Sequence, residues 1–261
     1  MREPADTAAR SAALTEAIVA ALPPDRPLRI LDLGSGTGSN VRYLSSRLPA
    51  PQHWLLVDRD PDLLAEASGR SANCQIETLG RNLGAPDSLA NLADPPLFPG
   101  RHLVTASALL DLVSDQWLRA LAGHCRAIGA AALFTLNYNG RSRCAPSEAE
   151  DDAIRDLMNR HQRTSDNGFG LAAGPDAVDC AERWFAAVGY QVRRAASDWI
   201  LLPDERELQR QLIEGWAQAA GEISPEQTSM IHDWLARRLA HVEAGRSRVI
   251  VGHEDLAAWL A

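Results

Sequence analysis

The sequence predicts a doubly wound α/β fold, with helices on both faces of a mostly parallel sheet. Short apolar runs that read as strands alternate with segments whose apolar residues recur at helical spacing. This alternation is typical of parallel sheets with right-handed crossovers. The first apolar run also ends in closely spaced glycines, directly before a helical segment. At 261 residues, 46% of them hydrophobic, the chain can bury one large core, so we expect a single domain over residues 1–261.

The first half of the chain reads as a series of strands and helices. An opening helix over 7–22 carries apolar residues at helical spacing and ends at the proline pair 23–24. Helical spacing also follows the first, second and fourth predicted strands. The strands themselves are expected over 28–33, 54–57, 74–79, 103–107 and 131–136.

The second half is more helical. Helical insertions are expected over about 146–163 and 204–243, and the tryptophan and leucine stripes of the second insertion are most simply core. Between them lie a glycine-rich loop over 166–174, a further helix and a strand over 190–195. A strand over 248–251 closes the sheet.

Composition removes several classes of function. The chain contains no lysine, and 26 basic residues against 34 acidic ones give a formal charge of −8. Without lysine, neither Schiff-base chemistry nor a Walker-type phosphate loop is available. A nucleic-acid partner is disfavoured, because nucleic-acid-binding proteins usually carry a basic footprint.

Metal and membrane partners are not expected either. The cysteines, Cys74, Cys125, Cys144 and Cys180, form no CxxC pair, and the histidines show no HExxH spacing. No stretch approaches the roughly 18 apolar residues of a membrane span, and acidic residues stand where a signal peptide would be apolar. We therefore expect a cytoplasmic protein with reduced thiols.

The most informative segment is the turn at 32–38, which reads Asp-Leu-Gly-Ser-Gly-Thr-Gly after the first strand. Glycines let the backbone turn sharply and let a ligand approach closely, while the following helix offers free amide groups. About twenty residues later Asp58 ends the second strand, where a carboxylate can accept both hydroxyls of a ribose. The pattern predicts a nucleoside site.

Two ligand classes fit this turn: a dinucleotide such as NAD(P), and S-adenosylmethionine, which has an amino-acid tail in place of a pyrophosphate. Asp32 favours the second, because a carboxylate beside the glycines repels a pyrophosphate but can hold an ammonium group. The dinucleotide pattern also calls for glycine or alanine at position 39, where this chain has Ser39.

At these residues the chain resembles the class I S-adenosylmethionine-dependent methyltransferases, over about residues 28–137. The resemblance implies a seven-stranded sheet with an antiparallel last strand and S-adenosylmethionine as cofactor. In this family the glycine turn passes beneath the methionine part, the acidic end of the second strand holds the ribose, and the end of the fourth strand lines the methyl side. The residues that would then bind the cofactor are Asp32, Gly34, Ser35, Gly36, Gly38, Asp58, Arg59, Asn82 and Ser107.

Candidates for the acceptor side follow strand ends or lie on the inserted helices. Asp111, Tyr138 and His161 are the candidates for catalysis, although Asp111 could instead cap a helix and the other two could be packing residues. Asn137 and Trp199 are candidates for lining the pocket.

Two further segments have an open interpretation. The glycine-flanked segment 165–170 suits a lid over substrate but also a plain exposed loop. Arg10 reaches the cofactor carboxylate if the opening helix folds over the glycine turn; otherwise it is a solvated surface residue.

The function predicted from the sequence is methyl transfer from S-adenosylmethionine to a small-molecule O-, N- or C-nucleophile by in-line displacement. Positioning accounts for most of the catalysis of such a reaction, so no single catalytic residue is obligatory. The alternatives are an NAD(P)-dependent oxidoreductase that uses the same crevice and a cofactor-binding module without turnover. The sequence leaves the acceptor and the oligomeric state open.

Overall fold

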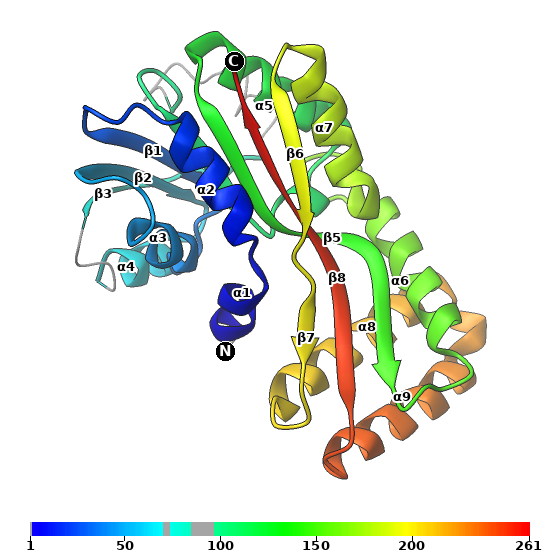
Figure 1. The fold of residues 1–261 in the computed structure, drawn as a ribbon. Helices are drawn as coiled ribbons and strands as arrows, with labels where there is room; N and C mark the ends of the chain where they lie inside the picture. The colour runs from blue at the N-terminus through cyan, green and yellow to red at the C-terminus, as the bar shows by residue number, and fades with distance from the viewer. Residues whose placement is uncertain (1, 70–73, 85–96) are drawn as a thin grey trace.

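The computed structural model describes residues 2–69, 74–84 and 97–261, in which eight strands form one sheet (Figure 1). The strand order is β3-β2-β1-β4-β5-β8-β6, and β7 pairs with β8 alone. Strands β1 to β5 run parallel, while β8 is antiparallel to β5 and β6, as expected. The strands are β1 Leu28–Leu33, β2 Gln52–Asp58, β3 Gln75–Gly80, β4 Leu103–Ser107, β5 Ala131–Ala145, β6 Gln191–Ala196, β7 Trp199–Leu201 and β8 Arg248–Trp259.

Helices cover both faces of this sheet, and three of them form a separate group at one end (Figure 1). The α-helices are α1 Glu3–Ala9, α2 Ala12–Ala21, α3 Ser39–Ser45, α4 Pro61–Gly69, α5 Asp115–Ile128, α6 Asp151–Thr164, α7 Ala177–Ala187, α8 Arg206–Ile223 and α9 Thr228–Glu243. Short 3₁₀ helices are η1 Leu110–Leu112, η2 Gly174–Asp176 and η3 Pro225–Gln227.

The opening helix is divided, contrary to the single helix predicted over 7–22. The Ser11 side chain accepts a hydrogen bond from the Leu14 backbone N–H and so starts a new helix, α2, after the end of α1. The Ser11 backbone N–H in turn donates to Asp255 Oδ2 of β8 at 2.8 Å. The break therefore anchors the N-terminal segment to the last strand, and α1 is directed towards β7 (Figure 1).

The sheet has one strand more than the predicted seven, and its last strands are longer than predicted. β5 continues nine residues past the expected end at 136, where Leu136 adopts a left-handed φ of +57° and the pairing with β8 shifts register. The residues beyond this bend are mostly polar, so the apolar run ends although the strand does not. Strand β8 is long enough to pair with two strands along the same edge: β6 pairs with its residues 254–259, and β7 pairs with its residues 249–251.

Three apolar clusters hold these layers together. Alternate residues of β1 point to opposite faces: Leu31 and Leu33 pack with α5 and α7, whereas Leu28 and Ile30 pack with α2, α3 and α4. A third cluster lies beneath the extension of β5 and β8, where α6, α8 and α9 meet it. Trp216 and Trp234 belong to this third cluster, so the aromatic stripes of the 204–243 insertion are core, as the sequence indicates.

Neither a membrane-spanning helix nor a metal cluster occurs in the part of the chain that the structure describes. Within those residues, every helix falls short of the length and apolar character that crossing a bilayer demands. The same residues contain no group of three or more His, Cys, Asp or Glu side chains placed to hold a metal ion.

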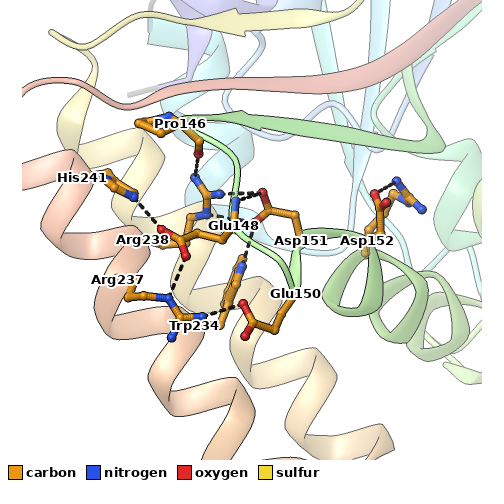
Figure 2. A network of polar contacts seen from close by, with 10 residues as sticks. Pro146, Glu148, Glu150, Asp151, Asp152, Trp234, Arg237, Arg238 and His241 are labelled. Atoms are coloured by element: carbon orange, nitrogen blue, oxygen red, sulfur yellow. Dashed lines mark hydrogen bonds and ion pairs between the residues drawn. The ribbon is translucent and has the colours of Figure 1, made fainter.

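A buried ion network fixes the helical group to the end of β5 (Figure 2). The Arg238 side chain of α9 is fully buried and donates from Nε and Nη2 to the Asp151 carboxylate at 2.9 and 2.5 Å. Its Nη1 donates to the Pro146 carbonyl at 2.6 Å, and the Trp234 indole N–H also donates to Asp151. The neighbouring Arg237 pairs with Glu148 and Glu150 at the surface.

We expect Arg238→Met to lower the free energy of unfolding by about 3–5 kcal/mol, because the Asp151 carboxylate would be left without its partner. Arg237→Met removes the same charge at the neighbouring position, where the side chain is 40% exposed. This substitution should lower the free energy of unfolding by only about 0–1 kcal/mol. Urea unfolding of both variants measures the difference. Equal losses would show that the Arg238 network does not hold the helical group in place.

Candidate functional site

The glycine turn lies at the carboxyl end of β1, between β2 and β4. The strand order reverses at β1, because the chain continues to β2 on one side of it and later returns to β4 on the other side. In open α/β sheets, ligands bind in a crevice at the carboxyl end of the strand where the order reverses. Gly34, Gly36 and Gly38 have left-handed φ angles of +64°, +50° and +79°, and Gly38 directly precedes α3. The turn is closed by a hydrogen bond from the Gly38 N–H to the Ser35 carbonyl at 2.9 Å.

Asp58, at the end of β2, is held against this turn. Its Oδ2 accepts a hydrogen bond from the Gly36 backbone N–H at 2.8 Å, and its Oδ1 accepts one from the Asp60 N–H at 3.1 Å. Each carboxylate oxygen has a second lone pair, so both can still accept a hydrogen bond from a ligand hydroxyl. The sequence prediction that Asp58 and the glycines face one site therefore agrees with the geometry.

Asp32 is completely buried beneath the turn. Its Oδ1 accepts a hydrogen bond from Asn40 Nδ2 at 2.6 Å, while its Oδ2 has no partner within residues 2–69, 74–84 and 97–261. Burial raises the pKa of Asp32 to about 7, against the opposing influence of the Asn40 hydrogen bond and the Arg10 charge. A cation placed beside this buried carboxyl group would strongly stabilise its ionised form.

Arg10 lies in the short segment between α1 and α2 and is buried, so the solvated-surface interpretation is wrong. It donates from Nη1 to Asn40 Oδ1 at 2.6 Å and from Nη2 to Ser107 Oγ at 3.0 Å. The side chain also stacks on the Tyr43 ring, with Cζ 4.7 Å from the ring centroid. Arg10 therefore lies against the first turn of α3, directly after the glycine turn, and against the end of β4.

Three buried polar atoms around the turn have no hydrogen-bond partner among the residues that the structure describes: Asp32 Oδ2, Arg10 Nε and Ser35 Oγ. Buried polar atoms are normally paired, so unpaired ones gathered at one place indicate a missing ligand or solvent. One of them is an acceptor, one a donor, and the hydroxyl can be either. The turn is thus suited to a ligand end that carries both a cationic and an anionic group.

A cavity of about 260 Å³ opens beside the turn. Gly34, Asp58, Arg59 and Asn82 line it, which brings together four residues that the sequence proposes for one site. Ser107 is not in its lining but bonds Arg10 instead. The remaining lining residues are Arg81, Leu83, Ala108, Leu109, Leu112, Asn167 and Phe169.

The segment 165–170 forms one wall of this cavity. A side chain at Gly84 would approach the Gly168 carbonyl oxygen to 2.1 Å, so the two backbones are in close contact. Phe169 packs edge-on against Trp117, with ring centroids 5.8 Å apart, and Asp166 Oδ1 accepts from the Gly168 and Gly170 N–H groups. Asn167 and Phe169 thus line the cavity from a segment that is packed against Gly84 and Trp117.

The acceptor-side candidates lie in two different places. Asp111 and Tyr138 are neighbours, since the Tyr138 backbone lowers the pKa of Asp111 and the Asp111 charge raises that of Tyr138. His161 instead contacts Glu222 of α8 at 2.8 Å and belongs to the helical group. Asn137 has a structural role, because it bonds the Leu110 N–H and the Glu254 carbonyl.

Sequence reasoning did not propose His253, Asp6 or Arg2, which surround Trp199. The Trp199 and His253 rings are 5.1 Å apart, and Arg2 lies over the Trp199 ring at 5.7 Å. Because the strand over 248–251 was expected to end before His253, and Asp6 precedes the expected helix start, no sequence signal placed either residue at a site.

A larger cavity, about 380 Å³, lies at the opposite edge of the sheet. Residues at the amino ends of the strands line it, among them Arg26, His53 and Arg101. In open α/β sheets ligands bind at the carboxyl ends of the strands. The smaller cavity beside the glycine turn is therefore the better candidate for the functional site.

The strand order, the antiparallel last strand and the glycine turn together define the fold of class I S-adenosylmethionine-dependent methyltransferases. Among solved structures, a presumed methyltransferase from Bacillus halodurans C-125 has a TM-score of 0.52 and 14% identity, covering 95% of this chain and 96% of that chain. The YcgJ protein from Bacillus subtilis has a TM-score of 0.50 and 13% identity over 96% of this chain and 100% of that chain.

The mycolic acid cyclopropane synthase CmaA1, in a complex with SAH and CTAB, also has a TM-score of 0.50, with 10% identity over 95% of this chain and 83% of that chain. No protein-family model matches the sequence, and no curated protein does so either. At these identities the likeness is one of fold.

We expect Gly38→Ala to destabilise the protein more than Gly36→Ala. Each substitution places a side chain on a left-handed backbone, which costs about 1–2 kcal/mol. A Cβ at Gly38 would in addition lie 3.0 Å from Ala67 Cβ, whereas a Cβ at Gly36 meets nothing within 4 Å. Thermal unfolding of the two variants measures the difference, and a Gly36 variant that is the less stable of the two would contradict this geometry.

Proposed function

We propose that the protein is an S-adenosylmethionine-dependent methyltransferase that acts on a small molecule. The observation that carries the proposal is the set of unpaired buried atoms around the glycine turn, Asp32 Oδ2, Arg10 Nε and Ser35 Oγ. The amino-acid end of S-adenosylmethionine carries an ammonium and a carboxylate. Asp32 would take the ammonium and Arg10 the carboxylate, so the ligand would supply the partners that these atoms lack.

The nucleoside end would occupy the cavity of about 260 Å³. Asp58 would accept the ribose hydroxyls with the lone pairs that the Gly36 and Asp60 amides leave free. Asn82 offers an amide group for the adenine edge, and Leu109 and Phe169 offer apolar surface for its ring. The fold shared with CmaA1, solved with SAH, supports this placement.

S-adenosylmethionine supplies an activated methyl group on a sulfonium. The protein's own contribution is to hold donor and acceptor in line and to exclude water, and this positioning is worth up to about 7–11 kcal/mol of barrier reduction. The Arg10 guanidinium and the Asp32 carboxylate fix the tail of the cofactor, while Leu109, Leu112 and Phe169 keep the cavity apolar on one side.

The small-molecule acceptor is supported by the net charge of −8, which disfavours nucleic acid. The dinucleotide alternative is disfavoured by the position of Asp32, because its buried carboxyl lies where a pyrophosphate would approach. A module without turnover would bind the cofactor but yield no product.

Calorimetry with S-adenosylmethionine, S-adenosylhomocysteine and NAD⁺ tests the proposal. We expect both sulfur nucleosides to bind and NAD⁺ not to bind. Binding of NAD⁺ alone would overturn the proposal in favour of an oxidoreductase. If the sulfur nucleosides bind, incubation with labelled S-adenosylmethionine and a metabolite extract separates an enzyme from a binding module, because only the enzyme yields a methylated product.

We expect Asp58→Ala to weaken S-adenosylhomocysteine binding by about 1.5–3 kcal/mol, since the ribose would lose a charged acceptor. Asp62→Ala, a change on the exposed first turn of α4, serves as the matched control and should bind normally. Calorimetry on both variants gives the two affinities. Unchanged affinity in Asp58→Ala would place the ribose elsewhere.

Cofactor affinity should rise with pH in the wild-type protein. The pKa of Asp32 is raised to about 7 in the free protein, and the bound ammonium favours the ionised form, so binding releases a proton below that pH. A group with this pKa is roughly one-tenth ionised at pH 6 and roughly three-quarters at pH 7.5, which predicts on the order of an eightfold gain in affinity. With a pKa of about 7.7–8.0, the ligand's α-amino group is almost fully protonated at pH 6 and roughly two-thirds protonated at pH 7.5, which reduces the expected net gain to about five- to sixfold.

Asp32→Asn tests the source of this pH dependence. The amide cannot ionise, so the affinity of the variant should be weak and should not rise between pH 6 and 7.5. Isothermal titration of S-adenosylhomocysteine at four pH values across this window measures both profiles. A variant that retains the wild-type slope would assign the titration to another group.

A further inference from the structure

Six side chains from five separate parts of the chain meet beside the proposed cofactor site. They are Arg2 at the start of α1, Asp6 on α1, Asp111 in η1, Tyr138 on β5, Trp199 on β7 and His253 on β8, and we call them the acceptor cluster. The His253 ring lies between two aromatic rings, 5.1 Å from Trp199 and 6.3 Å from Tyr138. The cluster exists only because β5 and β8 continue past the bend at Leu136.

The cluster carries two carboxyl groups in a buried setting. Asp6 is 2% exposed, and burial raises its pKa. Burial also raises the pKa of Asp111 to about 6, and none of the described residues offers its Oδ1 atom a hydrogen bond. Both pKa values are lowered again by the charge of Arg2, so the guanidinium stabilises the ionised form of both carboxyls.

Several polar atoms of the cluster remain unpaired. Within the described part of the chain, Asp6 Oδ1, Trp199 Nε1 and His253 Nδ1 are buried and have no hydrogen-bond partner, although the indole is near enough to Asp6 to lower its pKa. Burial lowers the pKa of His253 to about 4, so the imidazole is neutral at pH 7. Two carboxyl oxygens and a neutral imidazole therefore offer acceptors for a ligand that donates hydrogen bonds.

Arg2 shows which chemistry this cluster accommodates. Its Nε donates to Asp6 Oδ2 at 3.3 Å, and its Cζ lies 5.7 Å from the centroid of the Trp199 ring. The side chain is 53% exposed, so it rests on the cluster from the solvent side. A nitrogen cation over an aromatic face and beside a carboxylate is the arrangement that binds organic ammonium groups in proteins.

The cluster adjoins the proposed cofactor site through two connections. The segment from Ala108 to Leu112 lies between them, since Ala108, Leu109 and Leu112 line the cavity while Asp111 is coupled to Arg2 and Tyr138. Arg10, which bonds Asn40 beside the glycine turn, also lowers the pKa of Asp6 through its charge.

We propose that the methyl acceptor is a small organic amine, bound as an ammonium between Trp199 and the carboxyls of Asp6 and Asp111, in the place that the Arg2 guanidinium occupies here. This inference depends on the proposed function and names its substrate class. An anionic acceptor would meet two carboxyls, and an apolar one would leave the buried acceptor atoms unpaired.

The reaction balances with the groups present. The ammonium passes one proton to the Asp111 carboxylate and becomes a neutral amine with a free lone pair. That lone pair forms a bond to the methyl carbon while the carbon–sulfur bond breaks, and the bonding electrons remain on sulfur. The products are a methylated ammonium, S-adenosylhomocysteine and a protonated Asp111. A carboxyl with its pKa raised towards neutrality is suited to this exchange.

Three fluorinated probes of one size test the proposal by ¹⁹F NMR: 4-fluorobenzylamine, 4-fluorobenzyl alcohol and 4-fluorobenzoate. With the protein saturated in S-adenosylhomocysteine, we expect the amine to bind at least tenfold more tightly than the other two. Arg2→Ala should tighten amine binding several-fold, because the competing guanidinium is gone. Arg26→Ala, which removes a charge at the opposite edge of the sheet, is the control and should leave it unchanged.

Asp111→Asn should abolish the preference for the amine over the alcohol without changing S-adenosylhomocysteine affinity. Benzoate or the alcohol binding as well as the amine, or an Arg2→Ala variant with unchanged amine affinity, would overturn the proposal. The saturation step keeps the two hypotheses apart. If S-adenosylhomocysteine does not bind, the proposed function fails; if it binds but the amine is not preferred, only the acceptor class is wrong.

Discussion

The site depends on one buried side chain, Asn40, which joins four separate parts of the chain. Its amide nitrogen donates to Asp32 Oδ1 at 2.6 Å and to Thr105 Oγ1 at 3.1 Å, and its oxygen accepts from Arg10 at 2.6 Å. Strands β1 and β4, helix α3 and the N-terminal segment are thus fixed to each other through a single amide. Asn40 is 2% exposed, and an unpaired buried amide would be costly, so these partners constrain each other's positions.

This constraint also explains why a charged pair is tolerated beneath the turn. Arg10 and Asp32 do not bond each other; each bonds a different end of the same neutral amide. The amide keeps the two charges apart and leaves one polar atom of each unpaired. In a direct ion pair, both groups would already have their partners, and a ligand would add few new hydrogen bonds. In the separated arrangement, a zwitterionic ligand can form hydrogen bonds with both groups.

Much of the fold and the position of the glycine turn beside Asp58 could be predicted from the sequence, because both depend on local signals. A few neighbouring residues are enough to recognise the glycines of the turn, Asp58 at the end of β2 and each strand or helix. The acceptor cluster could be predicted only in part: the sequence offered Asp111, Tyr138 and Trp199 as candidates but gave no reason to bring Arg2, Asp6 and His253 to them. Tyr138 and His253 are neighbours because β5 and β8 pair across the bend at Leu136, and a left-handed leucine at that position has no sequence signature.

The division of the opening helix was missed for a related reason. The helical spacing of α2 is genuine, but the polar residues of α1 carry no such pattern, and a seven-residue helix has little stability by itself. Tertiary contacts hold it instead: Glu3 forms a two-pronged ion pair with Arg42 of α3, and Arg42 also donates to the Thr37 carbonyl of the glycine turn.

Helix α1 therefore connects the two halves of the site. Arg10 at its end bonds Asn40, the amide that also holds Asp32, and Asp6 on its buried side contributes to the acceptor cluster. A ligand that pairs with Arg10 would stabilise the docked position of α1, and the docked position is the one that brings Asp6 to Trp199. Ligand binding at the turn and assembly of the acceptor cluster are therefore coupled through one short helix, because both favour the docked position of α1.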